Sequence, residues 1–102
     1  MKKKKLKVYD YDAAEFLDSE EVIAGYLSET FAIGTDAQIK TALANVARAR
    51  NMTDIARKMK VSRPSLYKSL APDTKTEFDT VRNFLNAVGV SMAVVPATAI
   101  PR

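Results

Sequence analysis

Apolar residues recur every three or four positions between residues 19 and 50, and this spacing predicts two amphipathic helices. The first begins after Ser19, whose hydroxyl can cap the free amides of a first turn, and ends at Gly34. The second covers residues 37 to 50, after a cap at Thr35 or Asp36. The positions expected in the core are Val22, Ile23, Tyr26, Leu27 and Phe31 in the first helix and Ile39, Leu43, Val46 and Ala47 in the second.

Three further helices are expected in the second half of the chain. Residues 53 to 59 and 63 to 70 form two short helices, and a last helix begins at Thr74 or Thr76 and runs to Val88 before Gly89. The apolar residues of this last helix are spaced three, four and three positions apart, so they should face the core. They are Phe78, Val81, Leu85 and Val88.

The two ends of the chain have strand-like patterns. Residues 6 to 11 alternate apolar and polar side chains, so residues 1 to 11 are interpreted as a basic N-terminal arm or short strand. Asp12 can cap a short helix over residues 13 to 17. Residues 90 to 95 are apolar and rich in β-branched side chains until Pro96, which predicts a C-terminal strand followed by a loose tail, together residues 90 to 102.

The chain is therefore expected to be all-α, with one helical domain at residues 12 to 89 and short terminal strand segments. The bundle should contain about five to six helices, since a chain of 102 residues suits one domain. A lone strand is unstable, so the two terminal segments should pair with each other, either within one chain or across a symmetric dimer. The sequence leaves these two arrangements open.

Composition removes most enzyme chemistry from consideration. The chain has no cysteine and no histidine, so disulfides, thiolate or imidazole metal sites, cysteine nucleophiles and histidine bases are excluded. We expect no catalytic activity, no cofactor and no metal.

No run approaches the roughly 20 apolar residues of a membrane helix, and the lysines at 2 to 5 precede charged sequence instead of an apolar signal core. A cytoplasmic protein without a membrane partner is expected.

Charge is divided between two parts of the chain. Residues 8 to 39 contain eight acids and no lysine or arginine, whereas residues 48 to 68 contain seven basic residues and Asp54 as the one acid. A chain with an acidic half and a basic half is suited to two partners of opposite charge. The alternative is that both halves are ordinary solvated helical faces.

Residues 53 to 70 have the pattern of a helix-turn-helix. Two short helices that meet steeply need a small residue at their contact, here Ala56, and an apolar residue in the turn, here Val61. Leu66 and Leu70 supply the inward face of the second helix. Ser62 is a suitable N-cap, and Pro64 falls in the first turn, where a missing amide proton costs little. The turn commonly has Gly where Lys60 stands, because the backbone there is often left-handed.

The outer face of the second helix is suited to DNA. Arg63 is the expected base-contacting residue, since the arginine fork matches two acceptors on guanine and recognition helices present their N-terminal side chains to base edges. The DNA-binding residues predicted from this face are Ser62, Arg63, Pro64, Ser65, Tyr67 and Lys68. The alternative is that this basic helical hairpin is only a surface element of a helical bundle.

Five segments resemble addiction-module antidote proteins with an XRE-type, lambda-repressor-like helix-turn-helix, the HigA-like antitoxins. The segments span most of the chain in one order, and the fourth is the most specific. They are Tyr-Asp-Tyr-Asp-Ala-Ala-Glu-Phe-Leu (9 to 17), Ile-Ala-Gly-Tyr-Leu (23 to 27), Ala-Leu-Ala-Asn-Val-Ala-Arg-Ala-Arg-Asn-Met-Thr (42 to 53), Val-Ser-Arg-Pro-Ser-Leu-Tyr-Lys-Ser-Leu (61 to 70), and Phe-Asp-Thr-Val to Val-Gly-Val (78 to 90). This family commonly has Gly where Asn51 and Lys60 stand here.

The resemblance implies an antitoxin that binds double-stranded DNA at its own operator, represses its operon and neutralises a small basic RelE- or ParE-like toxin. It implies no toxin-contacting residue by motif. A homodimer is expected independently, because two recognition helices related by a two-fold axis can reach successive major grooves about 34 Å apart. Two alternatives stay open: a stand-alone XRE-type regulator without a toxin, and a helical interaction module without DNA binding.

Overall fold

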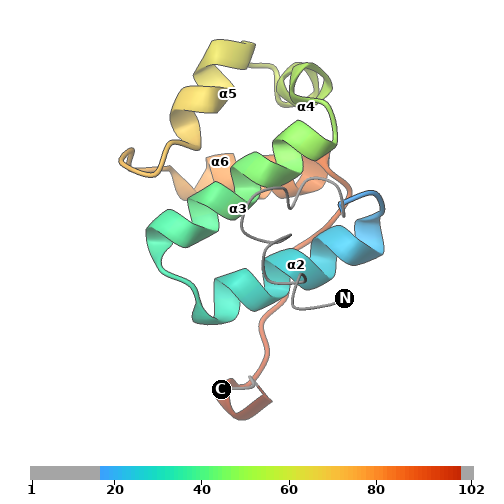
Figure 1. Cartoon of the computed structure of the whole chain (residues 1–102), viewed down its shortest axis with the longest axis vertical. Helices are drawn as coiled ribbons and strands as arrows, with labels where there is room; N and C mark the ends of the chain where they lie inside the picture. The colour runs from blue at the N-terminus through green and yellow to red at the C-terminus, as the bar shows by residue number, and fades with distance from the viewer. Residues whose placement is uncertain (1–16, 100–102) are drawn as a thin grey trace, which may run out of the picture.

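The computed structural model describes residues 17–99, and this part of the chain contains five α-helices and no strand. The elements are α2 (Glu20–Ile33), α3 (Asp36–Ala49), α4 (Met52–Met59), α5 (Arg63–Ser69), α6 (Phe78–Ala87) and the short 3₁₀ helix η2 (Ala97–Ala99). α2 packs on α3, α3 on α4, and α4 on both α5 and α6 (Figure 1). The expected all-α class is confirmed. The predicted N-terminal arm and the helix at 13 to 17 lie almost wholly outside the described residues.

The helix starts follow the capping residues of the sequence. The Ser19 hydroxyl accepts a hydrogen bond from the Val22 amide at 3.2 Å. At the start of α3, Thr35 and Gln38 form a reciprocal capping box, in which each side chain accepts from the other residue's backbone amide. These bonds satisfy amides that have no partner within the helix, which explains why Ser19 and Thr35 define where α2 and α3 begin.

One hydrophobic core joins the helices. All of its members are nearly inaccessible to solvent, and Phe84 and Ile23 are among the largest side chains that are fully buried. The core consists of Leu17, Ile23, Leu27, Ala42, Leu43, Val46, Ala47, Met52, Ile55, Ala56, Leu66, Leu70, Phe84, Leu85 and Val88. The predicted core positions Tyr26, Phe31, Ile39 and Val81 are partly buried and pack against it.

Two predicted core positions, Val22 and Phe78, are wrong, since their side chains are 41% and 65% exposed. Val61, expected as the apolar residue of the turn, is also 41% exposed. The core residues that the prediction missed include Leu17, Ala42, Met52 and Phe84. Phe78 is the first residue of α6, one turn beyond the part of the helix that reaches the core. Phe84, which is fully buried, takes its place: together with Val81, Leu85 and Val88 it completes the i, i+3, i+4, i+7 face of a packed helix.

The start of α6 also differs from expectation. Its N-cap is Glu77, which makes no side-chain capping bond. The hydroxyl of Thr76 instead donates to the carbonyl of Ser69 at 2.6 Å, so this side chain ties the loop back to the end of α5. The acid in the first turn, Asp79, still provides the favourable charge for the helix dipole.

The predicted C-terminal strand is wrong. Residues 90 to 96 are extended but pair with no strand in the described part of the chain, and η2 follows at 97 to 99. In Figure 1 this tail leaves the helical body at the end opposite α4 and α5. A strand requires a ladder partner, and the other predicted strand, residues 6 to 11, lies outside the described residues, so the pairing of the two termini stays untested.

Arg50 links the beginning of α2 to the end of α3. Its guanidinium donates to the carbonyl of Asp18 at 3.0 Å and lies 3.8 Å from the Glu20 carboxylate. Both side chains are partly exposed, so the ion pair itself contributes little, whereas the bond to the backbone fixes the chain at the entrance to α2. None of the described helices is long and apolar enough to cross a membrane.

The register of α5 is tested by comparing two adjacent residues. Leu66 is 1% exposed and Tyr67 is 45% exposed. Leu66→Ala should lower the free energy of unfolding by about 2–5 kcal/mol through lost apolar transfer and a cavity, while Tyr67→Ala should lower it much less. Thermal and urea melts measure both. Equal destabilisation by the two variants would mean that α5 faces the core differently.

Candidate nucleic-acid interface

α4 and α5 are joined by a tight turn of three residues, 60 to 62. Lys60 caps α4 in the left-handed conformation, with φ 61° and ψ 40°. The amide of Val61 then donates to the carbonyl of Ala56 at 3.0 Å, which satisfies a carbonyl at the end of α4 while the chain reverses. The backbone thus adopts at Lys60 the conformation for which this turn usually has Gly.

A second residue with positive φ stands at the other end of α4. Asn51 has φ 79°, and its side-chain oxygen accepts from the amide of Asp54 at 3.2 Å. Gly is the residue that usually tolerates such backbone angles, and Asn is the next best. Asn51 and Lys60 are the two non-glycine residues with positive φ in the described part of the chain, and they stand at the two positions where the resemblance implied Gly.

α5 buries one side and presents the other. Leu66 and the capping residue Leu70 are 1% and 2% exposed, whereas the residues of the opposite side are all exposed. The Ser62 hydroxyl accepts from the amide of Ser65 at 3.1 Å and donates to the Ser65 hydroxyl at 3.0 Å, so the first turn is capped. The structure brings the six predicted residues together on one surface, namely Ser62, Arg63, Pro64, Ser65, Tyr67 and Lys68.

The guanidinium of Arg63 is held by two neighbours. It donates to the hydroxyl of Thr53 on α4 at 3.3 Å and to the hydroxyl of Tyr67 at 3.4 Å, and it lies 5.6 Å from the centre of the Tyr67 ring. The last contact is a cation–π arrangement. These contacts restrict the rotamers of Arg63 yet leave some of its five N–H donors free for an incoming acceptor. Sequence reasoning missed Thr53, because the contact joins residues ten positions apart on different helices.

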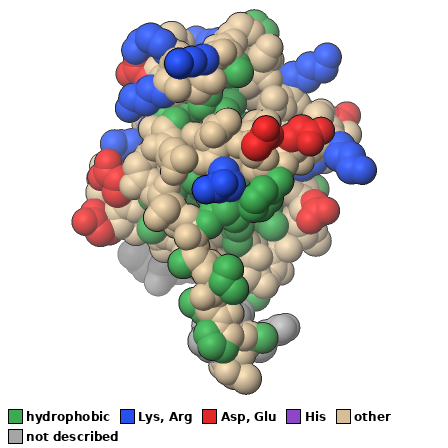
Figure 2. Space-filling model, turned by 180° about the vertical axis from the view of Figure 1, so that it is seen from behind, with side chains coloured by type: hydrophobic (Ala, Val, Ile, Leu, Met, Phe, Trp, Pro, Cys, Tyr) green, Lys and Arg blue, Asp and Glu red, His purple; other side chains and the backbone are tan. Residues whose placement is uncertain are grey.

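Positive side chains surround this surface. Arg57, Lys58, Lys60, Arg63 and Lys68 are exposed on α4, the turn and α5, and Asp54 is neutralised by an ion pair with Arg57. Lys and Arg side chains gather at this end of the molecule, while most acidic ones visible in the same view lie below them (Figure 2). Such a surface attracts phosphate. The described residues contain no cluster of three or more side chains suited to hold a metal ion.

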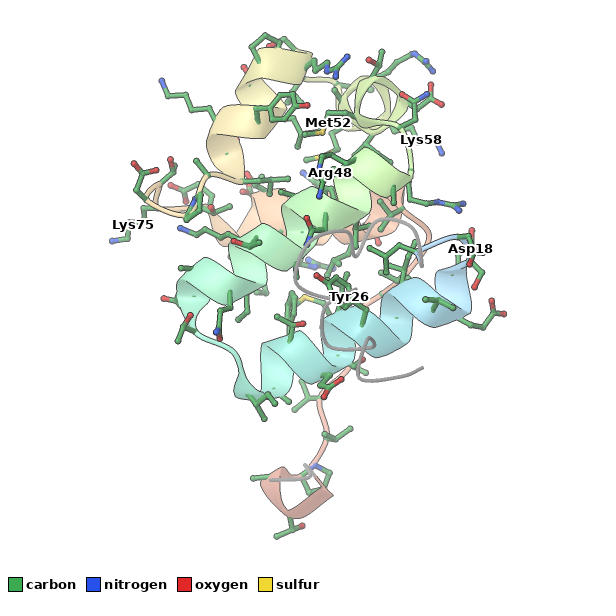
Figure 3. The ribbon with its side chains drawn as sticks, viewed as in Figure 1. Asp18, Tyr26, Arg48, Met52, Lys58 and Lys75 are labelled. Atoms are coloured by element: carbon green, nitrogen blue, oxygen red, sulfur yellow. The ribbon has the colours of Figure 1, made fainter. Side chains whose placement is uncertain are left out.

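Arg48 extends the positive surface onto α3. It is exposed in the last turn of that helix and donates to Asn45 at 2.5 Å, and Asn45 in turn donates to the Tyr26 hydroxyl at 3.0 Å. Figure 3 shows Arg48 on α3, above Tyr26 of α2. The side chain of Arg48 is therefore positioned by a chain of two hydrogen bonds that begins on α2.

Comparison with known proteins shows the family of this chain. A family model described as "Probable addiction module antidote protein" matches residues 7–96. The chain belongs to this family. It is also 41% identical over 85 residues to a Haemophilus influenzae protein described as uncharacterized, a match covering 83% of this chain and 88% of that relative. No solved structure matches the chain. Membership of an antidote family indicates an antitoxin role and a toxin partner.

The cost of the left-handed turn can be measured at Lys60. Lys60→Gly should raise the free energy of unfolding by up to about 1 kcal/mol, because a side chain in this conformation costs roughly 1–2 kcal/mol and the greater unfolded-state entropy of Gly offsets part of the gain. Lys58→Gly, at an exposed helical position in the last turn of α4, is the matched control and should lower stability by up to about 1 kcal/mol. Chemical denaturation measures both. If both variants are destabilised alike, Lys60 is not strained.

Proposed function

We propose that this antidote protein binds double-stranded DNA through α4, the turn and α5, acting as an XRE-type helix-turn-helix. The proposal rests on Arg63, whose guanidinium is hydrogen-bonded to Thr53 and Tyr67. Arg63 lies on the exposed side of α5, and the other side of this helix is buried in the core. An arginine held in place loses less side-chain entropy on binding, which favours base contact over a loose phosphate contact. The remaining basic residues contact phosphates and set the salt dependence of binding.

The biological consequence we propose is autorepression together with toxin neutralisation. A HigA-like antitoxin binds its own operator and also a small basic toxin of the RelE or ParE class. The division of charge supports this pair of partners, since α2 carries acids and no base while the α4–α5 surface is basic. Both partners would place its action in the cytoplasm. The protein supplies binding surfaces to both, and no catalytic step is assigned to it.

The DNA-binding proposal is tested at two residues with different roles. Arg63→Ala should weaken binding to the protein's own promoter by about 1–3 kcal/mol and relax the preference at one base pair. Lys68→Ala should weaken binding to all sequences and reduce the slope of log K against log salt. Fluorescence anisotropy with promoter and scrambled duplexes measures affinity and salt dependence.

The matched control is Lys75→Ala, which removes an exposed charge from the loop between α5 and α6. It should bind like the parent protein. An Arg63→Ala variant with the affinity and sequence preference of the parent would remove Arg63 from the interface. No saturable binding by the parent protein to its promoter would reject DNA recognition altogether.

We further propose a homodimer held by the C-terminal tail. Val94 is 98% exposed and Met92 and Val95 are about half exposed, so the tail presents apolar side chains to solvent. Figure 2 shows hydrophobic side chains on this projecting segment. Two copies related by a two-fold axis can bury these apolar side chains by packing their tails against each other.

The dimer is tested by removing residues 91–102. Val90 is retained because it packs against the core and its amide donates to the carbonyl of Leu85 at 3.0 Å. The truncated chain should sediment as a monomer and bind its promoter less tightly, with the α4–α5 unit intact. Val94→Lys should have the same effect, and Thr98→Lys in the same tail should not. A parent protein that is monomeric at micromolar concentration, with a truncated form that binds equally well, would refute the proposal.

A further inference from the structure

A groove opens between the C-terminal half of α2 and the N-terminal half of α3, away from the basic surface. Its volume is about 630 Å³. α2 contributes Tyr26, Glu29, Thr30 and Ile33, Gly34 follows in the connection, and α3 contributes Ala37, Gln38, Thr41 and Ala42. α2 and α3 follow each other in the sequence and pack against each other, so the two walls of the groove are held in a fixed arrangement.

Most polar groups along the groove are already hydrogen-bonded within the chain. The Thr30 hydroxyl donates to the carbonyl of Tyr26 at 2.9 Å, the Gln38 side chain caps α3 through Thr35, and the Tyr26 hydroxyl accepts from Asn45. What the groove offers a ligand is therefore mainly apolar surface from small side chains, together with Ile33, which is 57% exposed. Such a surface suits an apolar side chain inserted from a partner.

The charge at the rim is negative. Glu29 is exposed at the edge of the groove, and no lysine or arginine contributes to its lining. α2 as a whole has Glu20, Glu21 and Glu29 and no basic residue, and α3 begins with Asp36. A ligand that combines an apolar anchor with a positive charge matches both features of the groove, and a basic amphipathic segment of a protein is such a ligand.

We propose that the α2–α3 groove is the docking site for a basic, amphipathic segment of the toxin, with an apolar side chain in the groove and a lysine or arginine at Glu29. This inference rests on the proposed antitoxin function and assigns to it a surface that the sequence did not locate. The groove and the α4–α5 surface involve different residues, so one molecule can hold the toxin segment and DNA at separate sites.

The experiment uses the full chain and the purified product of the reading frame adjacent to its gene, titrated by calorimetry. Glu29→Lys reverses the rim charge and should weaken binding at least about tenfold. Ala37→Trp fills the groove without changing charge and should weaken it similarly. The matched controls are Glu21→Lys, an exposed acid elsewhere on α2, and Ala32→Trp, an exposed alanine outside the groove lining. Both should bind within about twofold of the parent, and melts confirm that all four variants fold.

The outcomes separate the inference from the function on which it rests. If the parent chain does not bind the neighbouring product, the antitoxin proposal fails and the docking site fails with it. If the parent binds and the groove variants bind equally well, or no worse than their controls, the docking site alone is wrong. Other occupants of the groove also give distinct results without the partner. A changed sedimentation coefficient in Ala37→Trp would identify a second copy, and changed amide signals from residues 1–16 would identify the chain's own N-terminal segment; either result overturns the proposal.

Discussion

The burial of two leucines determines whether this molecule has a recognition surface at all. α5 contains seven residues, too few to be stable as an isolated helix, so its position depends on Leu66 and Leu70 in the core. Their insertion fixes the rotation of α5 about its axis, and that rotation alone places Arg63, Tyr67 and Lys68 on the outside. The hydrogen bond from Thr76 to Ser69 then holds the end of α5 as the chain turns toward α6.

The two left-handed residues around α4 show what the fold requires of its backbone. Asn51 precedes the first residue of α4 and Lys60 follows the last, and both have a positive φ, which residues other than Gly seldom adopt. The compensation is local at Asn51, whose side chain caps α4, and at Lys60 it comes from the bond between Val61 and Ala56. Because the left-handed conformation at position 60 does not favour Lys, the surrounding packing of Ala56 and Leu66 must supply the free energy that keeps the turn closed.

The parts of the fold that the sequence predicts are those decided by local chemistry. Ser19, Thr35 and Ser62 cap helices where the sequence places them, since a cap depends on residues within one turn. Phe84 was missed because the spacing of Val81, Leu85 and Val88 already satisfied a helical stripe, and only the packed structure shows how far around α6 the core extends. The C-terminal strand was wrong because strand pairing is decided by a distant partner, which apolar composition does not reveal. Among the candidate site residues, the cap Ser62 and the five on α5 follow from one capped helix, whereas Thr53 follows only from the contact between two helices.

The separation of charge along the molecule determines whether its two proposed surfaces interfere. The α4–α5 surface lies at one end of the longest dimension, 39 Å, and α2 lies on the far side of α3 from it, between that surface and the C-terminal tail (Figure 1). At physiological ionic strength the Debye length is about 8 Å, so exposed charges on α2 that lie farther than this from the basic surface are largely screened from it. The acids of α2 therefore do not cancel the attraction of the basic surface for phosphate. Glu20 of α2 and Arg50 pair with each other. The exposed acids on the rest of α2 and the basic residues of the α4–α5 surface stay available to separate partners.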